Sequence, residues 1–315
     1  MVTLILDQYL TNDFALYNGD CVEVLQRLPS NRIDYSVFSP PFASLYTYSN
    51  SERDFGNSRT YEEFWAHFSF LIREIYRVMR PGRNVSVHCM NLPTSKQHHG
   101  YIGIKDFRGD VIRAFEYSGF IYHSEVTVWK DPVVAMQRTK ALGLLWKQLK
   151  KDSSMSRQGV PDYVVTFRKP GVNMKPICHT AEEFPVDEWQ KLASPCWMDI
   201  KQSNTLNKKL AREKEDERHI APLQLDLIHR CLRLWSMPGD TVLSPFAGIG
   251  SEGYVSLQLR RKFIGVELKK SYFELAKKNL EDAAKALRIP ESPYFGEVPK
   301  QISADEVNQL TMPLE

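Results

Sequence analysis

Short apolar runs alternate along the chain with longer stretches in which apolar residues recur every three or four positions. A continuous apolar run is typical of a strand buried on both faces, whereas the three-to-four spacing is typical of an amphipathic helix. Alternation of the two patterns predicts an α/β fold with a mostly parallel sheet. The runs predict strands at 35–38, 85–88, 126–129, 163–167, 241–243 and 262–266, and the spaced stretches predict helices at 61–79, about 222–235 and 271–287.

The helix expected at 61–79 has the clearest pattern. Its aromatic and aliphatic residues fall on one side, and Pro81-Gly82 follows its last turn and ends it. Thr60 with Glu63 forms the sequence of a capping box at its start. We expect this apolar stripe to pack in the core rather than to line a cofactor pocket.

The first motif that indicates chemistry is Ser39-Pro40-Pro41-Phe42, directly after the strand expected at 35–38. Open α/β sheets bind ligands at the carboxyl ends of their strands, which is where this motif falls. Proline has no backbone N–H, so the two prolines offer carbonyl acceptors only. The Ser39 hydroxyl and the Pro40 carbonyl can accept both N–H bonds of an exocyclic amino group, while Phe42 offers a face for base stacking, worth about 1–3 kcal/mol. Taken alone, the four residues also fit an ordinary proline-rich turn with a core phenylalanine.

The second motif is a glycine loop at 242–251, between an expected strand and a helical stretch. Gly248 and Gly250 let the backbone approach a ligand closely, and the helix start that follows favours an anionic group such as a carboxylate. Glu267, seventeen residues after Gly250, ends the next expected strand, where a carboxylate can accept the two hydroxyls of a ribose. The combination predicts a site for an adenosine-containing cofactor.

The two motifs together resemble the motif pair of the S-adenosylmethionine-dependent DNA amino-methyltransferases. The catalytic motif precedes the cofactor loop, which is the order of the permuted subgroup called β. The resemblance covers about 14–134 and 217–287, and its matched stretches include 18–20, 80–82 and 219–232. It implies a Rossmann-like methyltransferase sheet with helices on both faces, plus a basic target-recognition region inserted between the two parts.

The resemblance also implies roles for individual residues. It places the catalytic group at Ser39, Pro40, Pro41 and Phe42, and the cofactor S-adenosylmethionine against Asp20, Ser39, His219, Pro222, Phe246, Gly248, Gly250, Ser251 and Glu267. Within the cofactor set, the glycine loop binds the amino-acid end, Glu267 binds the ribose and Asp20 lies near the adenine. Two of these residues have a structural alternative, because Asp20 also suits a helix cap and Pro222 the first turn of a helix.

The sequence departs from the family's pattern at two positions. Ser244 stands where the family commonly has Asp, which leaves a DNA-binding regulatory module with a degenerate cofactor site as an alternative. Ser39 stands where adenine-N6 enzymes usually carry Asp or Asn, and serine, commonly after threonine, is more typical of cytosine-N4 enzymes; here Phe38 precedes it. The whole chain nevertheless resembles stand-alone, phage-type enzymes associated with adenine. We therefore expect site-specific methylation of adenine N6 in a flipped base, with cytosine N4 as the alternative target.

The chain of 315 residues has 41 basic and 38 acidic side chains, a formal charge of +3 that by itself indicates no partner. The charge is unevenly placed, because 137–175 holds nine basic and two acidic residues, a balance of +7 that leaves −4 elsewhere. A localised cationic segment suits phosphate contacts, and it lies where the resemblance places the recognition region, so we expect double-stranded DNA as the partner. The candidate DNA contacts are Arg138, Lys140, Lys147, Lys150, Lys151 and Arg157.

These features divide the chain into four parts: a first part of the catalytic core at 1–134, a recognition insert at 135–216, a second, cofactor-binding part at 217–287 and a tail at 288–315. Five scattered cysteines without a Cys-x-x-Cys pair predict neither a zinc knuckle nor a disulfide framework, and we expect no metal site. No stretch reaches the roughly 20 apolar residues that a membrane span needs. The expectation is a cytoplasmic protein, associated with the nucleoid when bound to DNA, and the resemblance implies a homodimer.

Overall fold

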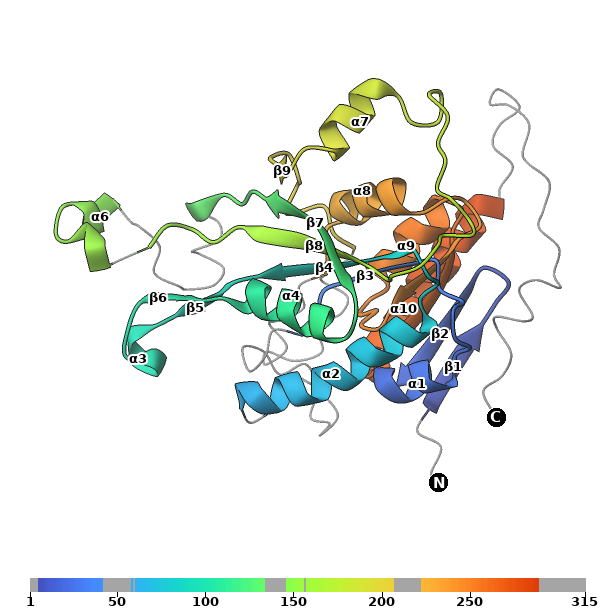
Figure 1. Ribbon diagram of the computed structural model, residues 1–315, viewed down its shortest axis with the longest axis horizontal. Coiled ribbons are helices and arrows are strands. Elements are labelled where there is room, and N and C mark those ends of the chain that lie inside the picture. The colour runs from blue at the N-terminus through green and yellow to red at the C-terminus, as the bar shows by residue number, and fades with distance from the viewer. Residues whose placement is uncertain are drawn as a thin grey trace.

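The computed structural model describes residues 5–41, 58, 60–133, 146–155, 157–206 and 222–288. These residues form a nine-stranded sheet with helices on both faces, and a separate two-stranded sheet (Figure 1). The strand order in the large sheet is β1-β2-β11-β10-β3-β4-β8-β7-β9. Its strands are β1 (Ile5–Leu10), β2 (Phe14–Gly19), β3 (Tyr35–Phe38), β4 (Asn84–Met90), β7 (Ile121–Val128), β8 (Asp162–Arg168), β9 (Cys196–Trp197), β10 (Thr241–Ser244) and β11 (Lys262–Glu267).

The centre of the large sheet is parallel, as the apolar runs predict. Strands β2, β11, β10, β3 and β4 run in one direction, whereas β1 and β8 are antiparallel to their neighbours β2 and β4. All six predicted strands are present, with ends that differ by a few residues. The β1–β2 hairpin was not among the predicted strands, because polar residues such as Asp7 and Gln8 interrupt its apolar pattern.

Helices and two short strands account for most of the remaining described chain. The short strands β5 (Leu92–Thr94) and β6 (Gly103–Lys105) pair with each other as a separate hairpin. The helices are α1 (Cys21–Arg27), α2 (Tyr61–Val78), α3 (Lys96–His99), α4 (Phe107–Tyr117), α6 (Trp146–Leu149), α7 (Val186–Leu192), α8 (Leu225–Trp235), α9 (Ser251–Gln258) and α10 (Lys270–Arg288). None of these helices combines the length and the apolar character that crossing a membrane requires.

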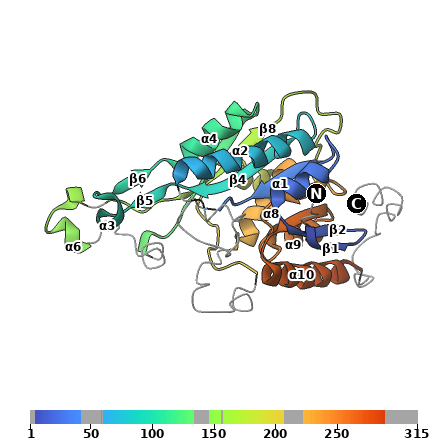
Figure 2. The ribbon, with the colours of Figure 1, turned by 90° about the horizontal axis from the view of Figure 1, so that it is seen from below.

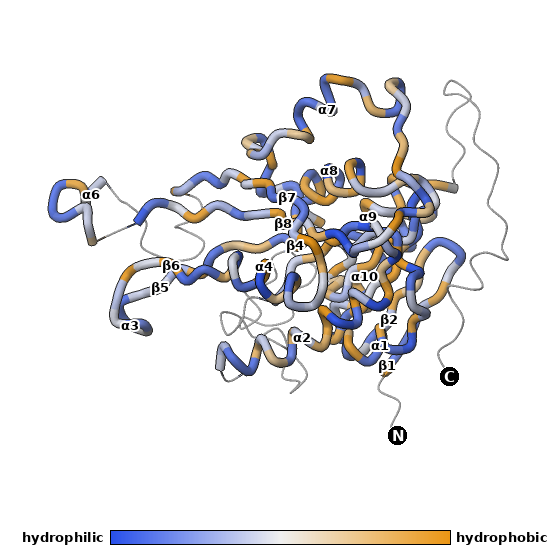
Figure 3. The backbone as a smooth tube through the Cα atoms, viewed as in Figure 1, coloured by the Kyte–Doolittle hydropathy of each residue, from blue (hydrophilic) through white to orange (hydrophobic). Residues whose placement is uncertain are grey.

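The longer helices cover both faces of the sheet (Figure 2). Helices α1, α2 and α4 pack into one buried apolar cluster, and α8, α9 and α10 pack into a second cluster across the sheet. Side chains alternate along β2, so that Ala15 and Tyr17 join the first cluster while Phe14 and Leu16 join the second. Figure 3 shows the apolar residues gathered along the strands and the helices that pack against them. The predicted Rossmann-like sheet with helices on both faces is therefore confirmed.

The helix predicted at 61–79 is α2, and its apolar stripe is buried as expected. Thr60 caps it by accepting the Glu63 N–H at 3.1 Å. The helix predicted from about 222 begins later, since the chain is extended before Gln224 and α8 starts at Leu225. Pro222 is therefore not in the first turn of a helix, and its structural alternative as a helix-start proline is wrong.

Part of the predicted recognition insert belongs to the sheet. Strand β8 pairs with β4 on one side and β7 on the other, although it lies within 135–216. Two of the basic residues counted in this region are likewise structural: Lys169 Nζ donates to Asn31 Oδ1 and the Met79 carbonyl, each at 2.8 Å, and Lys175 pairs with Asp240. The cationic region that remains for a partner is therefore smaller than the charge count indicated.

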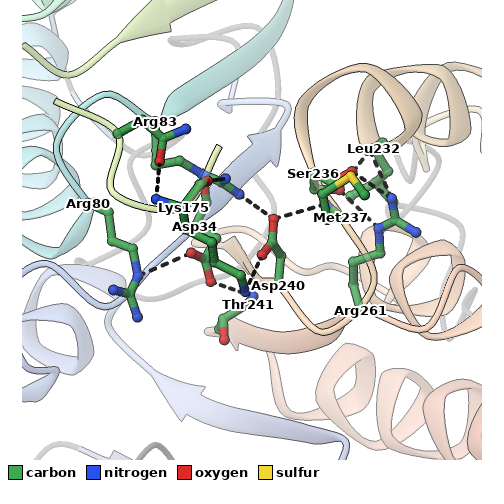
Figure 4. A network of polar contacts seen from close by, with 11 residues as sticks. Asp34, Arg80, Arg83, Lys175, Leu232, Ser236, Met237, Asp240, Thr241 and Arg261 are labelled. Atoms are coloured by element: carbon green, nitrogen blue, oxygen red, sulfur yellow. Dashed lines mark hydrogen bonds and ion pairs between the residues drawn. The ribbon is translucent and has the colours of Figure 1, made fainter. Parts of the chain in front are cut away.

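A buried polar network lies beneath the amino ends of three neighbouring strands (Figure 4). Arg83 precedes β4, and Asp34 and Asp240 precede β3 and β10, so these side chains lie at the opposite end of the strands from Ser39. The Arg83 side chain is completely buried, and its guanidinium donates to the Asp240 carboxylate and, at 2.7 Å, to the Asp34 carbonyl oxygen. The guanidinium thus connects three strands of the sheet.

Both carboxylates of the network are also held from a second side. Asp34 Oδ2 accepts the Thr241 N–H at 2.9 Å, which ties the start of β3 to the start of β10. Lys175 Nζ lies 2.7 Å from Asp240 Oδ1, and the Lys175 carbonyl accepts a hydrogen bond from Arg83 at 3.0 Å. Without Arg83, the buried Asp240 carboxylate would keep only the half-exposed Lys175 of these two cations, and breaking a buried ion pair is strongly destabilising, so the sheet depends on Arg83.

We expect Arg83→Met to lower the free energy of unfolding by about 3–5 kcal/mol, because the buried Asp240 carboxylate loses its fully buried partner. Urea unfolding followed by circular dichroism measures this change. The matched control is Arg113→Met, since Arg113 is 64% exposed beside Asp110 and its loss should cost less than about 1 kcal/mol. Equal losses in the two variants would contradict the role assigned to the network.

Candidate active site

The proline motif lies at the carboxyl end of β3, in the middle of the sheet. Ser39 directly follows this strand and is half-exposed, while Pro40 and Pro41 are buried. Strands β10 and β4 pair with β3 on its two sides and run parallel to it, so all three strands end at the same edge. This edge is where an open α/β sheet binds its ligands. Phe42, the last residue of the motif, lies outside the described residues.

The Ser39 hydroxyl faces a histidine that the sequence did not single out. Ser39 Oγ lies 2.7 Å from His88 Nδ1 and 3.1 Å from the His88 carbonyl oxygen. His88 belongs to β4 and is 7% exposed, and its Nε2 lies 3.0 Å from Asp162 Oδ2 at the start of β8. Sequence reasoning missed His88 and Asp162 because the pairing of β4 with β8 is not visible in the periodicity.

The glycine loop connects β10 to α9 at the same edge of the sheet. Gly248 and Gly250 both have positive φ angles, +53° and +87°, which favour glycine. A Cβ atom at Gly248 would meet nothing within 4 Å among the described residues, whereas one at Gly250 would lie 3.3 Å from Ala276. The backbone at Gly248 is thus open to a ligand, while Gly250 allows the close approach of α10.

Glu267 ends β11 and contacts the glycine loop directly. Glu267 Oε2 accepts the Gly248 N–H at 2.9 Å, and Oε1 accepts the Lys269 N–H at 2.8 Å. Asn18, at the end of β2, donates from Nδ2 to the carbonyl oxygens of Glu267 and Leu268 at 2.8 and 2.9 Å. The structure therefore brings the loop and the acidic residue together, as their spacing predicted. The contact of Glu267 with a ribose stays a prediction.

For the other predicted cofactor residues, the described part of the chain shows no arrangement that points to a cofactor. Asp20 caps α1, with Oδ1 accepting the N–H groups of Val22 and Glu23 at 2.9 and 3.1 Å. Its structural alternative is therefore present, and its position near the adenine stays a prediction. Pro222 is half-buried in the extended stretch before α8. His219 lies outside the described residues.

Two hydroxyl groups at the two ends of the loop are fully buried. Ser244 Oγ and Ser251 Oγ are inaccessible and have no hydrogen-bond partner among the described residues. Neither oxygen presents accessible surface to a ligand in this structure. Phe246, in the same loop, packs on Phe38 and Phe68 with ring centroids 5.8 and 6.4 Å apart. The contact of Phe246 and Ser251 with the amino-acid end of S-adenosylmethionine stays a prediction.

A buried acidic residue, Glu252, follows Ser251 in the first turn of α9 and was also missed by sequence reasoning. Burial, helped by the charge of the nearby Glu267 carboxylate, raises the pKa of Glu252 to about 8. The only signal in the sequence was a charged residue directly after the glycine loop, which equally fits an exposed helix start.

Three of the candidate DNA contacts lie in or directly after α6. Helix α6 is at one end of the molecule (Figure 1), and Lys147, Lys150 and Lys151 in and after it are exposed. Lys150 Nζ lies 5.6 Å from the centre of the Trp146 ring, which is itself 73% exposed. Arg157 is half-buried and donates to the Gln158 carbonyl at 2.8 Å. The two remaining candidates, at positions 138 and 140, lie outside the described residues.

Known proteins of one family share both the sequence pattern and the fold. A family model described as DNA methylase, of the N6 and N4 type, matches residues 33–278. The type II methyltransferase M.BglII of Bacillus subtilis is 23% identical over 262 residues, which are 83% of this chain and 67% of that protein.

Two solved structures resemble this one across most of the chain. A DNA modification methylase from Thermus thermophilus, in complex with S-adenosyl-L-methionine, gives a TM-score of 0.63 at 22% identity and covers 89% of this chain and 96% of that one. The PvuII DNA methyltransferase, described as cytosine-N4-specific, gives 0.60 at 18% identity and covers 98% of this chain and 95% of that one. The family model spans well over half of the chain, so the chain belongs to the DNA methylase family of N6 and N4 amino-methyltransferases, whose cofactor is S-adenosylmethionine.

Proposed function

We propose that this protein methylates the exocyclic amino group of a base in double-stranded DNA, at a specific site, with adenine N6 as the target. One observation carries the proposal. Strands β3 and β10 are paired and parallel, and at the same edge of the sheet β3 leads into the proline motif and β10 into the glycine loop. A methyl donor bound to the loop and an amino group bound to Ser39 would therefore meet there.

Ser39 and Pro40 would prepare the amino group for attack. A base inside a duplex hides this group, so the nucleotide must first be flipped into the pocket. The Ser39 hydroxyl hydrogen has two acceptors on His88, which leaves oxygen lone pairs free to accept an N–H of the base. The Pro40 carbonyl would accept the second N–H, and Phe42 would stack on the base. Both N–H bonds are then held, which favours a tetrahedral nitrogen with an available lone pair.

The cofactor pocket completes this alignment. S-adenosylmethionine, when bound, supplies an activated methyl group on a sulfonium centre. The glycine loop, with Phe246, Gly248, Gly250 and Ser251, would hold its amino-acid end, and Glu267 its ribose. Two features, the open backbone at Gly248 and its contact with Glu267, support a competent pocket over the alternative of a regulatory module with a degenerate cofactor site. Catalysis rests mainly on positioning, which can lower a barrier by several kcal/mol, about 7–11 in favourable cases.

The choice of adenine rests on the resemblance of the whole chain to phage-type adenine enzymes. Ser39 in place of an acidic residue favours the alternative, cytosine N4, and the PvuII enzyme with the same fold is described as cytosine-N4-specific. Because that enzyme is only 18% identical, its likeness concerns the fold and leaves the adenine proposal in place.

We also propose that the exposed lysines around α6 contact DNA phosphates. Lys147, Lys150 and Lys151 are free of ion pairs among the described residues, and Trp146 beside them offers a stacking surface. The protein is proposed to act as a homodimer in the cytoplasm, by resemblance to the family's permuted members.

Methyl transfer from labelled S-adenosylmethionine to duplex DNA, followed by digestion and mass spectrometry, tests the reaction and its target. We expect N6-methyladenine from the wild-type protein. Ser39→Ala should slow single-turnover transfer about 10²-fold or more, since one preorganised polar contact to the reacting group is lost. N4-methylcytosine as the product would overturn the adenine assignment, and an unchanged rate in Ser39→Ala would overturn the role of the motif.

The raised pKa of Glu252 predicts a stability that falls as pH rises. The folded protein keeps the Glu252 proton up to about pH 8, whereas the unfolded chain releases it near the ordinary glutamate value, so folding becomes less favourable across that interval. Thermal unfolding of the cofactor-free protein between about pH 5 and about pH 9 measures this loss. Glu252→Gln has no proton to release, so its melting temperature should fall less over the same interval. Parallel pH profiles of the two proteins would contradict the assignment.

Neutralising Lys150 and Lys151 together, as Lys150→Gln with Lys151→Gln, should weaken DNA binding and reduce its dependence on salt. Each lost phosphate contact lowers the slope of log affinity against log salt by about 0.9. The matched control is Lys278→Gln with Lys285→Gln, two exposed lysines on α10 far along the chain from α6. Fluorescence anisotropy at several salt concentrations measures the DNA affinity of both double variants. An equal loss of affinity in the two would contradict a specific DNA contact at α6.

A further inference from the structure

A row of polar side chains runs behind Ser39 across three adjacent strands. Ser39 follows β3, His88 lies on β4 and Asp162 begins β8, in the order in which these strands lie in the sheet. Ser39 Oγ lies 2.7 Å from His88 Nδ1, and His88 Nε2 lies 3.0 Å from Asp162 Oδ2. The second carboxylate oxygen of Asp162 is paired with the Lys130 ammonium group. The row therefore starts at the Ser39 hydroxyl and ends at a carboxylate whose negative charge is balanced by Lys130.

The row is buried, and burial of such groups has a free-energy cost. Asp162 is 2% exposed and His88 is 7% exposed, although an apolar residue at either position would pack without that cost. Burial would raise the pKa of Asp162, but His88 and Lys130 outweigh it and lower that pKa. The carboxylate is therefore ionised in the folded protein.

One tautomer of His88 suits both partners. With the ring neutral and its hydrogen on Nε2, which lies 3.0 Å from Asp162 Oδ2, the lone pair of Nδ1 would face the Ser39 hydroxyl. Ser39 then donates its hydrogen toward His88 and turns its oxygen lone pairs toward the substrate. The arrangement matches the geometry in which an acid and a histidine orient a serine in hydrolases, with the roles of the two ring nitrogens exchanged.

We propose that His88, oriented by Asp162, positions Ser39 as an acceptor and receives the proton that the methylated amino group releases. This inference rests on the proposed function. The C–S bond of the donor breaks as the N–C bond forms, and the sulfur keeps the electron pair and becomes neutral. The nitrogen becomes cationic, and its proton passes to Ser39 Oγ while the Ser39 proton passes to His88 Nδ1. The resulting imidazolium is stabilised by the Asp162 carboxylate and later releases its proton to water.

The residue that follows His88 on β4 faces the opposite side of the sheet. Cys89 points into the cluster beneath α4, on the face where Arg108 pairs with Glu125 at 2.8 Å. On the side of His88, Asp162 contacts the imidazole and Lys130 contacts the other carboxylate oxygen of Asp162.

Single-turnover methylation of duplex DNA by the full chain tests the proposal with a double-mutant cycle. We expect His88→Ala to lower the rate about 10²-fold or more in the wild-type background. In a Ser39→Ala background, where the path through the serine is absent, the same change should cost less than about twofold. Asp162→Asn should lower the rate in the wild-type background as well. His123→Ala, a change on β7 outside the row, serves as the matched control and should leave the rate unchanged.

Asp162→Asn in the Ser39→Ala background provides a readout that a purely structural role would not move, and it does not depend on a His88 variant that folds. In that background the change should alter the rate less than about twofold, because Asp162 acts only through His88 on Ser39. Equal losses from His88→Ala in both backgrounds, or equal losses from Asp162→Asn in both backgrounds, would overturn the proposal alone. Absence of any methylated base with the wild-type protein would instead overturn the proposed function, and the proposal with it.

Discussion

The parallel pairing of β3 with β10 is the constraint on which the site depends. The two strands are far apart in the chain, and the hydrogen bond from Thr241 N–H to Asp34 Oδ2 joins residues 207 positions apart. The Asp34 N–H donates back to the Thr241 carbonyl at 3.0 Å, and Ser36 Oγ donates to the Leu243 carbonyl at 2.9 Å. Because the strands are held in register from their amino ends, they also end together, which places the proline motif beside the glycine loop.

Buried charged groups lie at both ends of the parallel strands, and the two groups have different roles. At the amino ends, Arg83 and the Asp240 carboxylate are fully enclosed, and Arg83 also donates to the Asp34 carbonyl, so the network connects strands and contributes to the fold. At the carboxyl ends, the row behind Ser39 is enclosed on the protein side and ends at a half-exposed hydroxyl. Low dielectric strengthens both networks. The second presents the Ser39 hydroxyl at the edge where the proline motif and the glycine loop meet, which is why the chemistry is assigned to that edge.

Local patterns predicted most of the fold and both motifs, because apolar runs, helix periodicity and strand-end motifs are properties of short segments. The amphipathic helix α2 and the contact between Gly248 and Glu267 followed from such patterns. The pairing of β8 with β4 could not be predicted, since it joins segments far apart in the chain. His88 and Asp162 were missed for the same reason, and Lys169 was counted with the cationic surface although it is buried against the core.

The central claim is that Ser39 and Pro40 hold the target amino group at the edge where the cofactor loop ends. A crystal structure of the protein with target duplex DNA and a non-reactive analogue of S-adenosylmethionine tests this claim most directly. The account predicts a flipped base whose exocyclic nitrogen lies within hydrogen-bond distance, about 3 Å, of both Ser39 Oγ and the Pro40 carbonyl oxygen. A base that stays stacked in the duplex, or an amino group that faces away from Ser39, would contradict it.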